Sequence, residues 1–183
     1  LGNAIASKFP ESGPIKVLIG VNAPADNWSR RRADGVIKAL EAWKKAHADR
    51  EITWDEIDAG LDYGTTGDRF GNYLTGTPDL TAYVDTGFWD VGVVSVLKDR
   101  GIEPGKIIIG GFDLVPDVLA QMKAGYIQFH VDQQPYLQGY AAVMQAPGIK
   151  NYKLAPYDVN TGSAVVTPDQ VDAILELSKQ GYR

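Results

Sequence analysis

The sequence predicts an α/β fold, a three-layer, doubly wound parallel sheet with helices on both faces. Short apolar runs alternate with segments of helical spacing over most of the 183 residues, which is the order expected of parallel strands joined by helical crossovers. Several runs are apolar at almost every position, as strands covered on both faces are. Glycine or proline stands at many of the boundaries, which separates one element from the next.

The strand candidates cover residues 16–21, 51–58, 80–84, 106–110, 127–131 and 164–166. The first is apolar at nearly every position, as a strand inside a sheet should be. The second alternates apolar and polar residues and is expected at an edge. The next three are again apolar runs. The last is a three-residue run that follows a turn-rich stretch over 146–162.

The helix candidates cover residues 29–48, 68–74, 88–100, 115–124, 135–144 and 167–180. In the first, apolar residues recur on one face, and Ser29 can serve as its N-cap. Gly101 and Gly125 are suitable C-caps for the third and fourth. Pro135 suits the first turn of the fifth, and Thr167 begins the last with a capping sequence.

Composition restricts the function classes. The net charge of -5 at pH 7 argues against nucleic-acid binding, which needs a basic surface. Zero cysteines exclude disulfides, thiolate catalysis and cysteine-based zinc sites. No apolar run approaches the ~20 residues of a membrane span, and Leu1 begins without the basic and apolar segments of a signal peptide. We therefore expect a mature protein or a fragment, with no cofactor.

Polar and aromatic side chains gather where the predicted strands end, the edge at which such folds bind ligands. Carboxylates, amides and arginine make paired hydrogen bonds to hydroxyl groups, and aromatic faces suit the C–H faces of a sugar ring. The combination predicts a small neutral sugar or polyol as the ligand. The candidate ligand-binding residues are Trp28, Arg32, Asp62, Tyr63, Asp85, Thr86, Phe88, Trp89, Asp113 and Gln133.

Each of these features also has a purely structural interpretation. Asp113 could simply cap the next helix, and Trp28 and Trp89 could serve packing. His130 lies within a strand and is expected to be structural, whereas His47 is expected to be exposed. No phosphate loop, metal-ligand spacing or nucleophile motif is present, so we expect no enzyme and no metal site.

Several motifs resemble the signature of periplasmic sugar-binding proteins. These are the ribose- and galactose-type binding components of ABC importers, which share their type I fold with the effector domains of LacI-type regulators. The motifs that carry the resemblance are Arg32-Ala33-Asp34-Gly35-Val36, Gly111-Phe112-Asp113, Pro116-Asp117, Lys123-Ala124-Gly125, Val131-Asp132-Gln133-Gln134-Pro135-Tyr136-Leu137-Gln138-Gly139-Tyr140 and the segment from Thr161-Gly162 to Thr167-Pro168.

The resemblance covers only the later part of the family's sequences. Complete members clamp a sugar between two hinged lobes. It implies that residues 1–145 form a carboxyl-terminal lobe, with 134–145 as a hinge-crossing helix, and that 146–183 form a closing segment and final helix. The amino-terminal lobe would be missing from this chain. Helix 135–144 would then expose an apolar stripe, which favours a dimer.

The resemblance also implies roles for single residues. Arg32 would bind ring or anomeric oxygens, Asp113 two hydroxyls, and Gln133 a further hydroxyl near the hinge. Thr86-Gly87 departs from the Asn-Asp that many members carry, which leaves room for a bulkier ligand and puts ribose in doubt.

The function implied is that of a periplasmic solute-binding protein whose closed form is recognised by a membrane permease. Three alternatives stay open. One is a ligand-sensing effector domain of a LacI-type regulator, although no helix-turn-helix or basic patch is present. Another is a sensor module that feeds a chemoreceptor or kinase. The third, an enzyme of flavodoxin-like architecture, lacks a phosphate loop and a catalytic pair.

Overall fold

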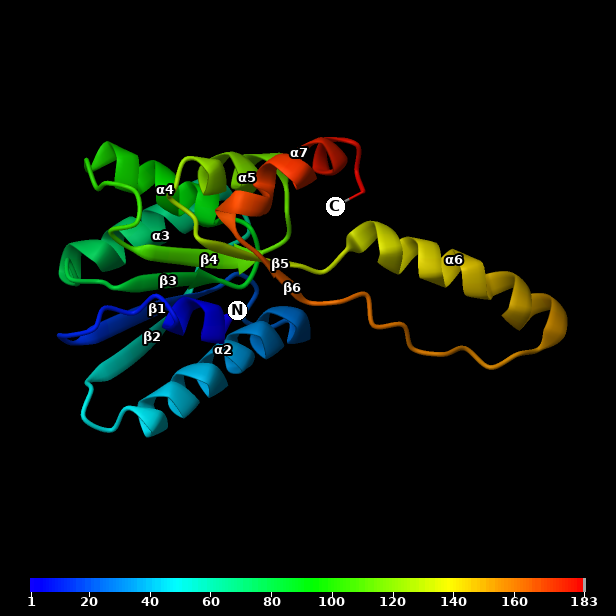
Figure 1. Ribbon diagram of the computed structural model, residues 1–183, viewed down its shortest axis with the longest axis horizontal. Helices are drawn as coiled ribbons and strands as arrows, with labels where there is room; N and C mark the ends of the chain where they lie inside the picture. Colours follow the sequence, from blue (N-terminus) through cyan, green and yellow to red (C-terminus); the bar gives the residue numbers. More distant parts are fainter. Residues whose placement is uncertain (183) are drawn as a thin grey trace.

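The computed structural model describes residues 1–182 and has a six-stranded sheet at its centre (Figure 1). The strand order is β2-β1-β3-β4-β5-β6. The strands are β1 (Ile15–Val21), β2 (Ile52–Asp58), β3 (Ala82–Asp85), β4 (Ile108–Phe112), β5 (Phe129–Asp132) and β6 (Ala164–Val166). The strands β1 to β5 are parallel, whereas β6 runs antiparallel to β5. The predicted sheet is therefore correct, with an antiparallel last strand.

Helices cover both faces of the sheet, as predicted. They are α1 (Gly2–Ala6), α2 (Asn27–Ala46), α3 (Tyr63–Gly76), α4 (Asp90–Asp99), α5 (Pro116–Lys123), α6 (Pro135–Tyr152), the 3₁₀ turn η1 (Pro168–Gln170) and α7 (Val171–Lys179). One face is covered by α1 and α2, the other by α3, α4, α5 and α7 (Figure 1). Each face has its own apolar core, in which Val17 and Leu40 or Tyr83 and Leu119 are fully enclosed.

The start of α2 differs from the prediction. The helix begins at Asn27 with Asp26 as its N-cap, so Ser29 is not the cap. Ser29 is instead the third residue of the helix and is buried, and its hydroxyl lies 2.8 Å from Thr86 Oγ1 and accepts a hydrogen bond from the Ala23 N–H. A serine near the start of a helix can either cap the helix or pack inside it. Here the contact with Thr86, directly after β3, fixes the second role.

Two other helices are longer than predicted. The carboxylate of Asp62 accepts from the Thr65 N–H at 2.7 Å and caps α3, which therefore begins at Tyr63 rather than 68. Helix α6 continues through Pro147 to Tyr152, where turns were predicted. The capping box at Thr167 is confirmed, although it opens the short turn η1 before α7.

Helix α6 and the extended return segment 153–163 project away from the sheet (Figure 1). We call residues 135–163 the arm. Helix α6 has no buried residue. The arm exposes a series of large apolar side chains: Tyr136, Tyr140, Val143, Met144, Ile149, Tyr152, Leu154, Tyr157 and Val159. Its base is fixed because β6 pairs with β5 immediately after the return. Within residues 1–182, no helix combines the length and apolar character needed to cross a membrane.

Candidate functional site

A cavity of about 210 Å³ lies at the carboxyl end of the sheet. Helix α2 and the segments that follow β3, β4 and β5 contribute its walls, because parallel strands all end at this edge. Its lining residues are Trp28, Arg32, Gly87, Phe88, Trp89, Asp113 and Gln133. Six of the ten sequence-predicted residues therefore come together here from four separate parts of the chain.

The guanidinium of Arg32, which lines this cavity, is held in place by two hydrogen bonds. Its Nη1 donates to the Thr86 carbonyl at 2.8 Å, and its Nη2 donates to Gln133 Oε1 at 3.1 Å. The group also lies 4.4 Å from the centre of the Phe112 ring and 5.0 Å from that of Trp28. Burial lowers the pKa of Arg32, while the charges of Asp113 and Asp85 raise it, and an arginine remains charged under these conditions.

Gln133 connects the arginine to the predicted carboxylate. Its Oε1 accepts from Arg32, and its Nε2 donates to Asp113 Oδ1. The three side chains form one row of alternating donors and acceptors, in which each holds the next in position. A ligand hydroxyl can donate to the carboxylate and accept from the guanidinium, so the row suits a polyol.

Aromatic rings flank the polar row. Trp28 and Trp89 lie with their ring centres 6.5 Å apart, and Phe88 stacks on Trp89 at 4.5 Å. Gly87 permits this packing, since a Cβ there would lie 2.3 Å from the Trp89 ring. Trp28 is 37% exposed, so much of its surface is free of the core. Apolar faces beside a row of hydrogen-bonding groups are what a sugar ring requires.

Asp85 and Thr86 lie beneath the cavity rather than on its wall, and both are fully buried. The Thr86 hydroxyl donates to Asn22 Oδ1 at 2.8 Å. The Asp85 carboxylate accepts from the Tyr83 hydroxyl and the Gly87 N–H, both at 2.8 Å. Burial, with the nearby Asp90, raises the pKa of Asp85 to about 7. Thr86 meets the site through its carbonyl, which Arg32 holds.

Asp62 and Tyr63 lie at the start of α3, outside the lining of this cavity. Asp62 caps the helix, and its hydrogen bonds from Thr65 lower its pKa. The Tyr63 hydroxyl donates to Asp117 Oδ2 at 3.4 Å, and burial with the charge of Asp117 raises the pKa of Tyr63 to about 12. A contact of either residue with a ligand stays a prediction.

The sequence did not identify Asn22 or Asp90 as part of this region. Asn22 is connected to the buried residues next to the cavity, because its amide donates to the Gly60 carbonyl and to the Asp85 carboxylate. Asp90 and His130 form a fully buried pair behind Asp113, with His130 Nε2 and Asp90 Oδ2 2.8 Å apart. The one available signal was a histidine inside an apolar strand, which was expected to be structural.

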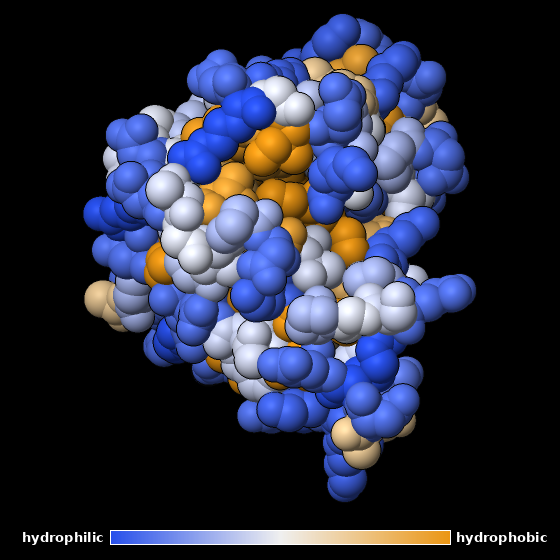
Figure 2. Space-filling model, turned by 90° about the vertical axis from the view of Figure 1, so that its left-hand side faces the viewer, coloured by the Kyte–Doolittle hydropathy of each residue, from blue (hydrophilic) through white to orange (hydrophobic). Residues whose placement is uncertain are grey.

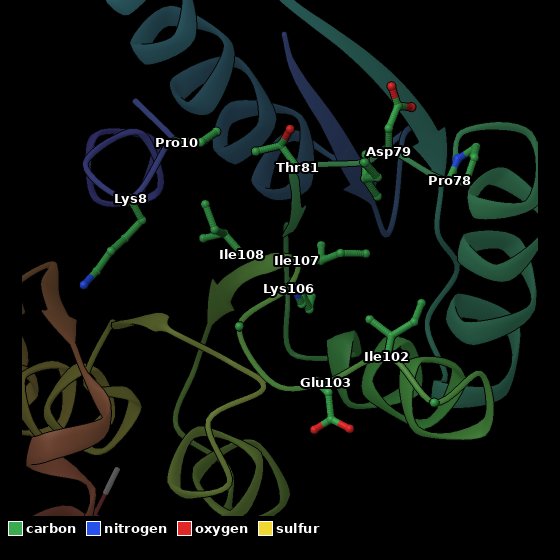
Figure 3. A pocket seen from close by; sticks show the side chains of 13 residues that line it. Lys8, Pro10, Pro78, Asp79, Thr81, Ile102, Glu103, Lys106, Ile107 and Ile108 are labelled. Atoms are coloured by element: carbon green, nitrogen blue, oxygen red, sulfur yellow. The ribbon is translucent and has the colours of Figure 1, made fainter. Parts of the chain in front are cut away.

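A larger hollow of about 640 Å³ lies at the amino end of the strands, away from this site. Figure 2 looks onto that end of the molecule and shows apolar side chains at the bottom of a depression. Ile102, Ile107 and Ile108 lie around its middle (Figure 3). Six of the residues predicted to bind a ligand line the smaller cavity and none lines this hollow, so the smaller cavity, at the carboxyl ends of the strands, is the better candidate despite its size. Among the described residues, no group of three or more His, Asp or Glu is arranged to hold a metal ion.

Comparisons with known proteins identify relatives of this chain. The xylose/arabinose-binding protein of Sulfolobus acidocaldarius is 27% identical over 186 residues, which cover 97% of this chain and 44% of the relative. The D-allose-binding periplasmic protein of Escherichia coli is 28% identical over 155 residues, covering 81% of this chain and 46% of the relative. The chain thus spans less than half the length of either relative.

Solved structures share the fold. The myo-inositol-binding protein of Caulobacter superposes with a TM-score of 0.82 at 22% identity, covering 97% of this chain and 59% of that one. The family model described as "Periplasmic binding protein domain" matches residues 1–151. This chain belongs to the periplasmic binding protein domain family.

Proposed function

We propose that this chain is the carboxyl-terminal lobe of a sugar-binding protein that serves an ABC importer. Its ligand is a small monosaccharide or polyol. The observation that carries the proposal is the row Arg32–Gln133–Asp113, held between Trp28 and Trp89 at the carboxyl end of the sheet. Donors and acceptors in one row between aromatic faces match hydroxyl groups on a ring.

Relatives support the substrate class. The two relatives are named for pentoses and for D-allose, and they are named as binding proteins rather than as enzymes. Membership of a periplasmic binding protein family implies a place outside the cytoplasm. An ABC permease in the membrane is the partner that follows from an importer, with recognition of the closed, sugar-loaded form.

The size of the cavity supports a second lobe. Ligand pockets that enclose a small molecule usually measure about 300–1,000 Å³. The cavity here measures about 210 Å³, below that range, so it would enclose a ligand only in part. An opposing surface would supply the remaining contacts and exclude water, which strengthens each hydrogen bond. We therefore expect this chain alone to bind sugar weakly, in the millimolar range.

The arm has a role in the same proposal. Its helix α6 exposes apolar side chains to solvent and has no buried residue. In the two-lobed protein this helix would cross the hinge and pack against the amino-terminal lobe. In the isolated chain, a second copy would be the nearest apolar partner.

A titration followed by nuclear magnetic resonance tests the proposal on the chain itself. The four tryptophans provide separate indole signals, and only Trp28 and Trp89 line the cavity. D-xylose, L-arabinose, D-allose and myo-inositol at millimolar concentrations should shift these two signals and leave those of Trp43 and Trp54 unchanged. Arg32→Ala should weaken the response about tenfold or more, since a charged hydrogen bond contributes about 1.5–3 kcal/mol.

The matched control is Arg31→Ala, because Arg31 is the exposed neighbour on the same helix. This variant should bind as the wild type does. Equal weakening by both variants would show a general effect of positive charge and would contradict the proposed site. A response of all four tryptophans, or of none at high concentration, would contradict sugar binding at this cavity.

The regulator and sensor alternatives use the same kind of pocket and differ in what is attached to it. Binding data on this chain cannot separate them from an importer. Co-purification of the complete protein with its membrane permease in the presence of sugar separates them, because neither alternative predicts that complex.

A further inference from the structure

The pair formed by Asp90 and His130 lies directly behind the predicted sugar-binding carboxylate. Both side chains are fully buried. His130 Nε2 and Asp90 Oδ2 are 2.8 Å apart, and the other ring nitrogen, Nδ1, lies 2.7 Å from the carbonyl oxygen of Asp113. The ring therefore connects helix α4 to the backbone of the residue whose side chain faces the cavity.

Asp113 is held from two directions. Its N–H donates to the Val131 carbonyl at 2.9 Å, and its own carbonyl accepts from the His130 ring. Its φ of 75° lies in the left-handed region, which costs a non-glycine residue about 1 kcal/mol or more. Gly111 pairs with His130 in the sheet, and a Cβ at Gly111 would lie 2.9 Å from the imidazole. The local sequence thus makes room for the ring beside a strained aspartate.

The pair needs one proton beyond those of a neutral histidine. A carbonyl oxygen only accepts, so the hydrogen bond to Asp113 requires a proton on Nδ1. A neutral imidazole has no second N–H, so the bond to Asp90 requires another proton, on Nε2 or on the carboxyl group. Loss of that proton leaves one of the two bonds without a donor.

The surroundings favour retention of the proton. Burial lowers the pKa of His130, but the charge and hydrogen bond of Asp90, the hydrogen bond to the Asp113 carbonyl and the charge of Asp85 together raise the pKa above its ordinary value. Among the described residues, Asp90 Oδ1 has no hydrogen-bond partner, and Asp90 Oδ2 is paired with His130. The other titratable groups that face the pair are Tyr63 from α3 and Tyr83 and Asp85 from β3, with Arg32 from α2 beyond Asp85.

We propose that Asp90 and His130 are positioning residues that hold Asp113 in its left-handed conformation and so direct its carboxylate toward Gln133 and the ligand. Neither residue touches the ligand. The proposal rests on the proposed function for its effect on sugar affinity, but the state of the ring and of Asp113 can be observed without any ligand.

The chain contains two histidines, His47 and His130, so few ring-nitrogen signals have to be assigned in a nuclear magnetic resonance spectrum. In the ligand-free wild type, Nδ1 of His130 should carry a proton at pH 7, above the ordinary histidine pKa of about 6.5. The backbone ¹³C and ¹⁵N shifts of Asp113 should move as His130 titrates. Asp90→Asn should remove the extra proton and make the Asp113 shifts independent of pH, because an amide N–H can donate to Nε2 while Nδ1 keeps its proton. His130→Leu should move the Asp113 shifts, whereas His47→Gln should leave them unchanged.

Sugar affinity provides the second readout, with D-allose and D-xylose as probes. His130→Leu, which removes the hydrogen bond to the Asp113 carbonyl, should weaken binding about tenfold, equivalent to about 1.4 kcal/mol. Asp90→Asn should keep an affinity close to that of the wild type and flatten its dependence on pH. An Nδ1 of His130 without a proton at pH 7 in the wild type would overturn the proposal, as would Asp113 shifts that ignore both the titration and His130→Leu. If His130→Leu does not fold, the wild-type pH series decides alone. If no sugar binds the wild type, the proposed function fails, while the ring and backbone signals still decide the positioning role.

Discussion

Arg32, Gln133 and Asp113 come from three segments that are far apart in the sequence, yet they form one hydrogen-bonded row. Their convergence could be predicted because the ends of parallel strands meet at one edge. The direction in which each side chain points could not be predicted from the sequence. Thr86 follows its strand as a site residue should, but its hydroxyl is turned inward to Asn22 and Ser29. The partnership of Asp90 with His130 spans 40 residues, and no local pattern indicates it.

Gly111 offers a test of packing at the residue scale. Gly111→Ala should lower the free energy of unfolding by about 1–3 kcal/mol, the usual cost of overpacking. The new Cβ would lie 2.6 Å from the Gly87 carbonyl oxygen and 2.9 Å from the His130 ring. Urea unfolding followed by circular dichroism measures the change.

The control is Gly35→Ala on helix α2, where a Cβ would meet nothing within 4 Å. This substitution should raise stability by about 0.5–1 kcal/mol, since alanine favours a helix over glycine. Equal stability of the two variants would contradict the close contact at Gly111.

At the scale of elements, every predicted strand and helix exists, and β2 lies at an edge as its alternating pattern indicated. Boundaries were less accurate where side-chain chemistry competes with apolar spacing. Asp62 caps α3, so the helix begins earlier in the sequence than predicted, although the glycine-rich segment 64–67 shows no apolar periodicity. Helix α6 passes through Pro147, a residue that commonly ends helices.

The arm provides the prediction at this scale. The isolated chain should self-associate through α6, because Val143 and Tyr140 are 70% and 52% exposed. Sedimentation velocity over a range of concentrations should show dimers, and Val143→Glu should reduce them by placing a charge in the apolar stripe. Ala42→Glu adds the same charge to an exposed position of α2 and should leave the dimers intact. A chain that stays monomeric at high concentration would contradict an adhesive arm.

The whole molecule combines a stable sheet with a group of buried ionisable side chains at one end. Burial raises the pKa of Asp85 from 3.8 to about 7, so between these values the folded chain keeps a proton that the unfolded chain has released. The free energy of unfolding therefore falls as pH rises from about 4 to 7. The raised pKa of His130 acts in the same direction, since its contribution is lost as pH rises through the folded pKa.

Unfolding experiments at pH 5 and pH 8 should show this decline in the wild type. Asp85→Asn should reduce it, because the amide has no titrating charge, while its oxygen can accept from the Gly87 N–H and its NH₂ group can donate to the Tyr83 hydroxyl oxygen. The full shift corresponds to roughly 4 kcal/mol at about 1.4 kcal/mol per pKa unit, which is an upper bound. Parallel pH profiles for the two proteins would contradict a buried, raised Asp85.

The arm leaves the sheet after β5 and returns directly to it as β6. A protease that cut the return segment would therefore cleave the chain, but the two fragments would stay associated. The piece beyond the cut would remain attached through the pairing of β6 with β5, through Ser178, whose hydroxyl donates to the Leu114 carbonyl at 2.5 Å, and through the Lys123–Asp172 ion pair. The same geometry makes the tip of the arm a natural place for new termini in a circularly permuted or split version of this chain.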